Sequence, residues 1–163
     1  MTARKAAVFL WFDGDAVEAA KFYAGTFPET VIETEIKSPM ETPGAGPGDP
    51  QLIEMTICGL PYVLINAGPP QSPPNDTYSL QVYTDNQEET DRLWNAIVDN
   101  GGEAIMCGWC KDRWGYRWQI TPHVLMESLS HPDPAAAKRA QEAMMQMQKI
   151  DIAKIEAAIA GNE

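Results

Sequence analysis

Two cysteines in the second half of the chain have the spacing of a redox or metal-binding motif. Cys107 and Cys110 are separated by two residues, as in redox pairs and zinc sites. A redox pair normally follows a strand and opens a helix, whose N-terminus lowers the thiol pKa. A zinc site needs a second pair of ligands, and Cys58 is the one cysteine left. Because the flanking sequence predicts two strands joined by a turn, we interpret the cysteines as a reduced pair without redox or zinc function.

The strand that follows these cysteines carries the polar residues best suited to binding a ligand. Gly115 supplies the backbone freedom for a turn at 112–115. Pro122 ends the strand 116–121, because proline has no backbone donor to continue a ladder. Gln119 and Arg117 alternate onto one face of this strand. Together they could bind an anionic or carbonyl-bearing ligand; alternatively, Arg117 forms an ion pair with one of the chain's many acids.

Aromatic side chains are the remaining candidates for the wall of a binding cleft. Small-molecule sites are mostly apolar and contain a few polar groups that fix the ligand. We therefore predict a cleft that binds a small organic molecule. The predicted ligand-binding residues are Gln119, Arg117, Tyr78, Trp11, Trp109 and Trp118. For each ring considered alone, packing in the core or in a dimer is the alternative.

Catalysis by a nucleophile or by paired carboxylates has little support in the sequence. Ser130 and His131 are adjacent, but no nucleophile-elbow motif is present. Acids such as Asp13 and Asp15 fall at the start of a predicted helix, where they complement the helix dipole. His123 and His131 flank prolines beyond the last predicted strand, and we expect solvated or capping roles for them.

The composition is that of a globular protein without a nucleic-acid or membrane partner. The 163 residues include 23 acidic and 12 basic side chains, for a net charge of -11. An acidic surface repels nucleic acid and anionic membranes. No segment reaches the ~18 apolar residues of a membrane helix, and the short apolar run before Asp13 does not fit a signal peptide. Few and unpaired cysteines are typical of a reducing compartment, so we expect a cytoplasmic protein.

The predicted elements follow the order strand, helix and three strands, twice over, and then helices. The first set is a strand at 6–12, a helix at 16–27 and strands at 30–37, 51–58 and 61–67. The second set is a strand at 78–84, a helix at 87–100, a strand at 103–107 and the hairpin that ends at 122. The Pro-rich loop 38–50 is expected to be mobile, and a long helical stretch capped by Asp133 is expected at 134–160. A repeated unit that cannot close its own sheet predicts two packed modules around a shared concave face.

This doubled order and two motifs resemble the vicinal oxygen chelate superfamily of glyoxalase and bleomycin-resistance proteins. The first motif is Phe12-Asp13-Gly14 followed by Ala16, Glu18, Ala19, Ala20, Phe22 and Tyr23. The second is Cys107-Gly108-Trp109, then Lys111-Asp112, an aromatic residue, Gly115, Trp118-Gln119-Ile120 and Pro122. Both are similar to the PhnB-like branch, which is often labelled demethylubiquinone methyltransferase. The resemblance spans roughly residues 5 to 160.

The resemblance implies an α+β fold of two βαβββ modules that form a curved mixed sheet, plus C-terminal helices. Within a single domain of residues 1–163, the modules are expected at about 5–68 and 77–122 and the helical extension at about 133–160. The superfamily also implies a homodimer. The apolar residues of the extension, several of them methionines, are expected to pack on the sheet or on the second subunit.

The resemblance further implies four metal-ligand positions. They fall at about Ala6 or Ala7, Ile65 or Asn66, Tyr78 or Ser79, and Gln119. None is His or Glu, and one neutral amide cannot hold a metal alone, so we predict no tightly bound metal and no cofactor. Methyl transfer from S-adenosylmethionine normally needs a glycine-rich strand-to-helix turn, whereas the glycines at 44–48 precede Asp49-Pro50. We therefore expect a metal-free protein that binds a small molecule; the alternatives are a metal-dependent lyase, isomerase or dioxygenase and, more weakly, a methyltransferase.

Overall fold

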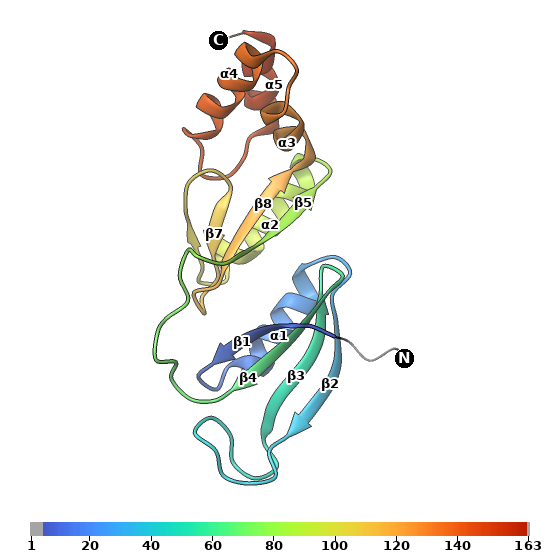
Figure 1. Cartoon of the computed structure of the whole chain (residues 1–163), viewed down its shortest axis with the longest axis vertical. Coiled ribbons are helices and arrows are strands. Elements are labelled where there is room, and N and C mark those ends of the chain that lie inside the picture. The colour runs from blue at the N-terminus through green and yellow to red at the C-terminus, as the bar shows by residue number, and fades with distance from the viewer. Residues whose placement is uncertain (1–4, 163) are drawn as a thin grey trace. The chain divides into compact units, whose positions relative to one another are not determined.

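Two four-stranded mixed sheets carry the fold, one in each of two compact units (Figure 1). The computed structural model describes residues 5–162. The first unit extends to Pro73, and the second begins at Pro74. The expected α+β fold, with two βαβββ modules and C-terminal helices, is confirmed.

The first unit has one helix packed on its sheet. Its elements are β1 (Val8–Phe12), α1 (Ala16–Thr26), β2 (Val31–Lys37), β3 (Pro50–Ile57) and β4 (Leu60–Asn66). The strand order is β1-β4-β3-β2, with β1 parallel to β4 and the other neighbours antiparallel. Alternate strand residues pack under the apolar stripe of α1. This core consists of Leu10, Phe12, Ile53, Met55, Ile57, Tyr62 and Leu64 from the sheet and Ala16, Ala19, Ala20 and Tyr23 from the helix.

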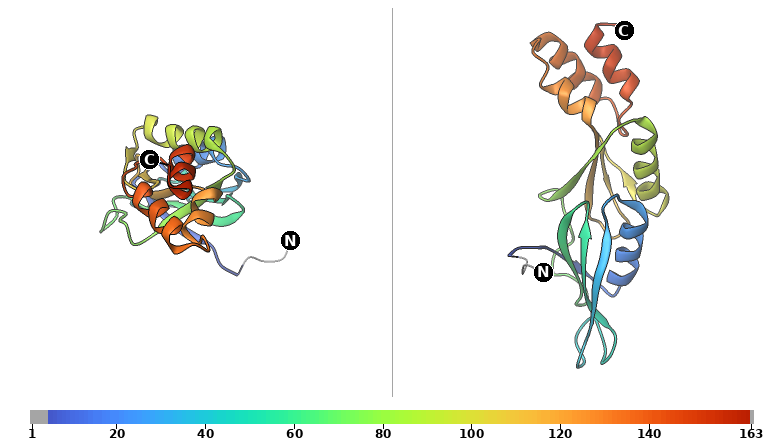
Figure 2. Two further views of the ribbon diagram at one scale, coloured as in Figure 1. Left: turned by 90° about the horizontal axis from the view of Figure 1, so that it is seen from above. Right: turned by 90° about the vertical axis from the view of Figure 1, so that its right-hand side faces the viewer.

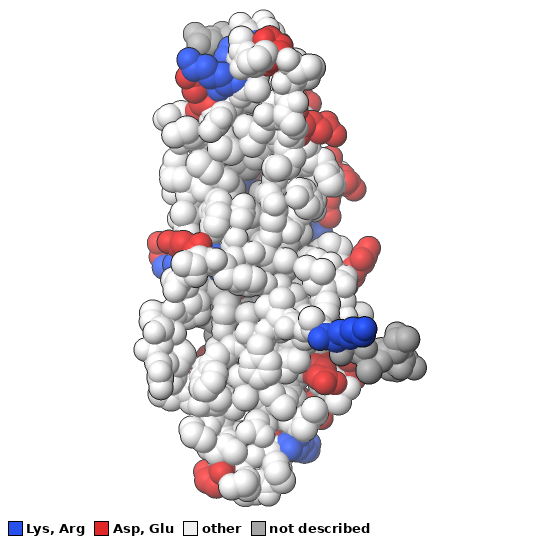
Figure 3. Space-filling model, in the orientation of Figure 1, with Lys and Arg blue, Asp and Glu red and all other residues white. Residues whose placement is uncertain are grey.

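The second unit repeats this order. Its elements are β5 (Ser79–Thr84), α2 (Gln87–Asp99), β6 (Glu103–Ala104), β7 (Trp109–Lys111) and β8 (Arg117–Pro122), in the strand order β5-β8-β7-β6. In each unit the helix covers one face of the sheet (Figure 2), and we call the opposite face the helix-free face. Over the β5–β8 sheet, the helix-free face shows few charged side chains (Figure 3).

A residue far along the chain provides the cap of α1. Asp15 immediately precedes this helix, but its side chain makes no capping hydrogen bond. Instead, Asn66 Oδ1 accepts from the backbone N–H of Ala16 at 2.9 Å. Asn66 Nδ2 also donates to the carbonyl of Pro50 at 2.9 Å. Because Asn66 ends β4, its amide ties the start of α1 to the sheet.

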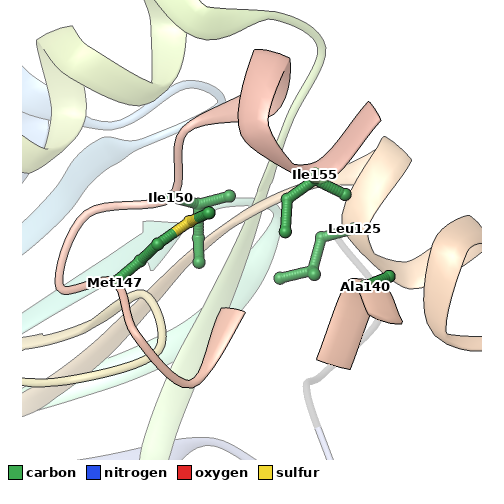
Figure 4. Packing of buried hydrophobic residues seen from close by; sticks show 5 residues of the cluster. All are labelled: Leu125, Ala140, Met147, Ile150 and Ile155. Atoms are coloured by element: carbon green, nitrogen blue, oxygen red, sulfur yellow. The ribbon is translucent and has the colours of Figure 1, made fainter. Parts of the chain in front are cut away.

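The C-terminal extension consists of three helices, the last two of which lie where the sequence predicted one long helical stretch at 134–160. They are α3 (His123–Leu129), α4 (Pro134–Met144) and α5 (Ile152–Ala160). Asp133 caps α4 as expected, since its side chain accepts from Ala135 N. The helices enclose a small apolar core (Figure 4) made of Leu125, Ala140, Met147, Ile150 and Ile155. Within residues 5–162, no helix has both the length and the apolar character needed to cross a membrane.

Tertiary hydrogen bonds explain why the predicted long helix is interrupted after Met144. The carbonyl of Met147 accepts from Cys107 N at 2.7 Å, and the carbonyl of Gln148 accepts from Gly108 N at 2.7 Å. These carbonyls are therefore unavailable to a continuous helix, and Asp151 then caps α5. Sequence periodicity indicates which face of a helix is apolar. It does not indicate that distant backbone N–H groups will bind the carbonyls that a continuous helix would need.

The loop between β2 and β3, expected to be mobile, is folded onto itself. Ser38 N donates to the carbonyl of Asp49, and Gly48 N donates to the carbonyl of Ser38, both at 2.8 Å. Thr42 N donates to the carbonyl of Ala45 at 2.9 Å. Ser38 and Ala45 are buried. These contacts give the loop a defined conformation.

Candidate functional site

The hairpin that joins β7 to β8 is organised by a buried acid. One carboxylate oxygen of Asp112 accepts from the backbone N–H groups of Trp114 and Tyr116, each at 3.0 Å. The other accepts from Trp118 Nε1 at 2.9 Å, and Asp112 is only 2% exposed. The predicted turn is present, with Gly115 N donating to the carbonyl of Asp112 and a φ of 92° at Gly115. Asp112 thus fixes the strands that carry the candidate site and is itself inaccessible to a ligand.

Gln119 lies at the centre of the helix-free face of the β5–β8 sheet. In the strand register it is opposite Gln81 on one side and Trp109 on the other. Side chains paired across strands point to the same face. The structure thus brings together two of the predicted ligand-binding residues, Gln119 and Trp109, and adds Gln81, which the sequence analysis did not select.

The polar groups on this face form a network of neutral hydrogen bonds. Gln119 Nε2 donates to Ser79 Oγ at 2.8 Å. Gln81 Nε2 donates to Thr121 Oγ1 at 3.1 Å, and Tyr83 OH donates to Gln81 Oε1 at 3.2 Å. The alternation of Ser79, Gln81 and Tyr83 along β5 is the sequence signal that could have identified them.

Arg117 lies on this face, but its guanidinium group is already bound to other groups of the protein. Its Nε lies 2.5 Å from Asp76 Oδ1, and its Nη1 donates to the carbonyl of Gly115 at 2.5 Å. Of the two interpretations left open by the sequence, the ion pair is the one seen in the structure. Lys111, which pairs with Arg117 in the register, is likewise bound to Glu103 at 2.6 Å. Both cations on this part of the sheet are therefore neutralised.

The other three predicted ligand-binding residues lie elsewhere. Trp118 belongs to the opposite face of β8 and is 2% exposed, so it is part of the core rather than of this surface. Tyr78 immediately precedes β5 and is exposed. Trp11 is on β1 of the first unit, where its Nε1 donates to the carbonyl of Gly68 at 2.7 Å. Strict alternation along β8 separates Trp118 from Gln119, and it could have been applied to the sequence.

A histidine missed as a site residue lies at the end of the same face. The ring of His123 stacks on Tyr83 with a centroid separation of 5.1 Å and an interplanar angle of 7°. Its Nε2 is 3.8 Å from Asp85 Oδ1. The pair of rings adds an aromatic surface beside Thr121, the neighbour of Tyr83 in the register. No sequence motif marks this contact, because His123 and Tyr83 come from different elements.

The four positions at which a superfamily metal is implied do not form a metal site. Ala6, Ala7 and Ile65 have no donor atoms, and Asn66 uses its amide to cap α1 and to bind Pro50. Gln119 donates to Ser79. Across residues 5–162, no group of three or more His, Cys, Asp or Glu side chains could hold a metal ion. These residues do not fit a divalent metal, which requires several anionic or imidazole ligands.

A concavity elsewhere in this unit is lined by residues that bind one another. It has a volume of about 470 Å³ between α2 and the connector that precedes α5. Lys149 Nζ lies 2.7 Å from Asp91 Oδ1, and Lys154 Nζ lies 3.4 Å from Asp151 Oδ2. Lys149, followed by Gln87, lowers the pKa of Asp91. Because its charges are mutually satisfied, we do not choose this concavity as the candidate site.

The three cysteines are free thiols with different environments. Cys110 is buried, whereas Cys107 and Cys58 are partly exposed. Burial, together with the Asp112 carboxylate, raises the pKa of Cys110 to about 12. Burial also raises the pKa of Cys58 to about 11, despite a hydrogen bond to Thr30 that lowers it. These shifts oppose the low thiol pKa that a redox motif needs.

We expect Cys58 and Cys110 to resist alkylation in the folded protein. At pH 8, iodoacetamide should modify each of them at least about 100-fold more slowly than in urea, because only the thiolate reacts and burial suppresses it. Peptide mapping by mass spectrometry would measure the rates, with the urea-unfolded chain as the control. Rapid modification of Cys110 in the folded protein would contradict this assignment.

Comparisons with known proteins agree with the fold. A family model described as 3-demethylubiquinone-9 3-methyltransferase matches residues 4–121. A PhnB protein from Bacillus cereus, named provisionally as such a methyltransferase, is 25% identical and superposes with a TM-score of 0.65 over 73% of this chain and 99% of its own. The fosfomycin resistance protein FosX from Listeria monocytogenes is 14% identical, with a TM-score of 0.53 over 78% of this chain and 98% of its own, and shows the fold alone. No functionally curated protein matches the chain.

The family match ends before the C-terminal extension. The model stops at residue 121, whereas α3 begins at His123. The sequence resemblance was expected to continue to about residue 160, and the family match does not support that part. The helices α3 to α5 are thus an addition to the matched region.

Proposed function

The chain belongs to the 3-demethylubiquinone-9 3-methyltransferase family, and from this premise we propose that it binds a small, uncharged organic molecule bearing carbonyl or hydroxyl groups. The proposed site is the helix-free face of the β5–β8 sheet, without a tightly bound metal. The observation that carries the proposal is the position of Gln119, between Gln81 and Trp109 in the register. An amide beside an indole offers a hydrogen-bond donor and acceptor next to a flat apolar wall.

The electrostatics of this face favour a neutral ligand over an anion. Arg117 is bound by Asp76, and Lys111 by Glu103. An anionic ligand would have to displace one of these carboxylates, and the net charge of -11 would oppose its approach. The amides of Gln81 and Gln119 can instead exchange their present partners for a ligand carbonyl or hydroxyl at little cost.

The two alternative functions have less support. A metal-dependent lyase, isomerase or dioxygenase would need ligands that the four implied positions do not supply. For methyl transfer, the glycine-rich segment 44–48 leads into strand β3 rather than into a helix, unlike a nucleotide-binding turn. We also propose that the protein is cytoplasmic and forms a homodimer. The exposed Met126 and Met145 of the extension support the dimer.

We expect removal of the Gln119 amide to weaken binding of a neutral carbonyl compound. With acetophenone as the probe, Gln119→Leu should raise the Kd about 3- to 10-fold, the loss expected for one neutral hydrogen bond. Saturation-transfer NMR titration would measure it. Gln141→Leu, on the exposed surface of α4, is the matched control and should leave the Kd unchanged.

The same titration separates the alternatives. Tighter binding of benzoate than of acetophenone would show that Arg117 rather than Gln119 selects the ligand. Native mass spectrometry with metal analysis should find no stoichiometric metal. A bound metal that is lost in Gln119→Leu would support the metal-dependent alternative and overturn the proposal.

A further inference from the structure

The helix-free face of the first unit has a different chemistry from that of the second. It is an apolar surface with an acid at its centre. Phe9 and Trp11 on β1 are 56% and 45% exposed, and Val31 and Ile36 on β2 are also exposed. On β3, between these edges, lies the exposed Glu54.

The strand register places Glu54 among these apolar side chains. Phe9 pairs with Val63, Val63 with Glu54, and Glu54 with Thr34. The next row of the sheet contains Trp11, Ile65, Leu52 and Ile36. With strands about 4.8 Å apart, the backbone of Phe9 is about 10 Å from that of Glu54. A molecule of modest size can therefore reach both side chains.

The side chain of Glu54 makes no hydrogen bond or ion pair within residues 5–162, while its backbone belongs to the ladders with β2 and β4. Thr56, two residues along the same face, donates to Glu33 Oε1 at 2.6 Å, so a second carboxylate lies on this side of the sheet. The nearest basic residue in the register is Lys37, which pairs with Pro50, four positions from Glu54 along β3. The face is therefore negative as well as apolar.

We propose that this face binds an amine-bearing apolar small molecule. Its ammonium group would pair with Glu54, and its apolar body would lie on Phe9 and Trp11. Aromatic faces attract cations as well as apolar groups, and the net charge of -11 favours the approach of a cation. The hydrogen bond from Trp11 Nε1 to the carbonyl of Gly68 holds the indole in place. This inference does not depend on the function proposed for the β5–β8 sheet, which concerns a neutral ligand and different residues.

The test uses three probes of similar shape and different charge. They are 2-phenylethylammonium, 2-phenylethanol and 3-phenylpropanoate, each titrated into the chain of 163 residues and followed through the indole N–H signal of Trp11 in a ¹⁵N–¹H NMR spectrum. A Trp11→Phe variant assigns that signal. We expect the ammonium probe to bind most tightly and the carboxylate probe to bind least.

Two variants with the same change in charge locate the effect. Glu54→Gln should weaken binding of the ammonium probe about fivefold or more and leave 2-phenylethanol unchanged. Glu35→Gln is the control, because Glu35 pairs with Ile53 on the opposite face of the sheet, and it should have little effect. Both glutamates are exposed, so both variants should fold.

Three results would overturn the proposal. The first is equal weakening by Glu54→Gln and Glu35→Gln, which would indicate attraction to the net charge alone. The second is an alcohol that binds as tightly as the ammonium probe. The third combines two observations: no probe changes the Trp11 signal, and light scattering shows that the chain dimerises but that Glu54→Lys does not. This result would mean that a second copy of the chain covers the face. None of these results bears on the acetophenone titration.

Discussion

Replacing Asp112 with alanine is expected to lower the free energy of unfolding of the second unit by about 3 kcal/mol or more. The carboxylate of this buried residue accepts from Trp114 N, Tyr116 N and Trp118 Nε1. The substitution removes three acceptor contacts at once. Leaving a buried donor without its acceptor costs about 1–3 kcal/mol for each group.

Urea unfolding followed by far-UV circular dichroism would measure this loss of stability through the shift of the unfolding midpoint. Asp112→Asn keeps one acceptor oxygen but places an NH₂ group among donors, so an intermediate loss is expected. Asp99→Ala is the control: Asp99 is exposed at the C-terminal end of α2, where an acid opposes the helix dipole, and its effect should be within about 0.5 kcal/mol. A loss below about 1 kcal/mol for Asp112→Ala would mean that the three hydrogen bonds do not hold the hairpin.

The role of Asp112 changes the interpretation of the hairpin motif. The motif combines Cys107-Gly108, Asp112, Gly115 and Gln119, and in the structure most of these residues build the scaffold. Cys107 and Gly108 form a turn with positive φ values of 62° and 81°, and their N–H groups bind the C-terminal connector. Among them, Gln119 is the residue that presents a polar side chain to the candidate site.

Local patterns in the sequence predicted the elements, and the resemblance to a known superfamily predicted how they assemble. Alternation in the strands, helical periodicity in α1 and α2, and the repeated order of elements indicate two similar units, whereas the α+β fold of two βαβββ modules was implied by the resemblance. Capping by Asp133 and the Gly115 turn are also local predictions. The errors concern contacts between distant residues. Asn66 caps α1 across 50 positions, and Asp76 neutralises Arg117 across 41 positions.

The candidate site was predicted only in part for the same reason. Gln119 was identified by resemblance, but its neighbours on the sheet depend on the pairing of β5, β7 and β8. A single sequence does not reveal that Gln81 and Trp109 lie on either side of Gln119. Trp118 was selected because it is aromatic, but it is adjacent to Gln119, and adjacent residues on a strand point to opposite faces. The apolar surroundings of Glu54 emerge only from the register of β1, β3 and β4.

The second large effect is expected for Gly44→Ala in the loop 38–50. A Cβ atom at this position would lie 2.3 Å from Ala67 N and 2.4 Å from the carbonyl carbon of Asn66. Both are backbone atoms, so no side chain can move aside, and the loop or the end of β4 must shift. Overpacking of this kind costs about 1–3 kcal/mol, and we expect the first unit to lose about 2–3 kcal/mol because the contact involves backbone on both sides.

Gly25→Ala provides a control of opposite sign. Gly25 lies within α1, and an added Cβ would meet nothing within 4 Å. Alanine is favoured over glycine in a helix interior, so this variant should gain about 0.5–1 kcal/mol. Urea unfolding of both variants measures the difference, and hydrogen exchange at Ser38 and Gly48 should accelerate only in Gly44→Ala. Similar stabilities for the two variants would show that the loop does not pack on β4.

Packing at Gly44 also has a consequence for the proposed amine site. The residue that follows Ala67 is Gly68, whose carbonyl accepts from Trp11 Nε1. A shift of Asn66, Ala67 and Gly68 away from the loop would move that acceptor and release the indole. Gly44→Ala should therefore weaken binding of 2-phenylethylammonium although the substitution lies outside the Glu54 face, whereas Gly25→Ala should not. In the proposed site, the loop would contribute to binding by fixing the position of Trp11 rather than by closing over the ligand.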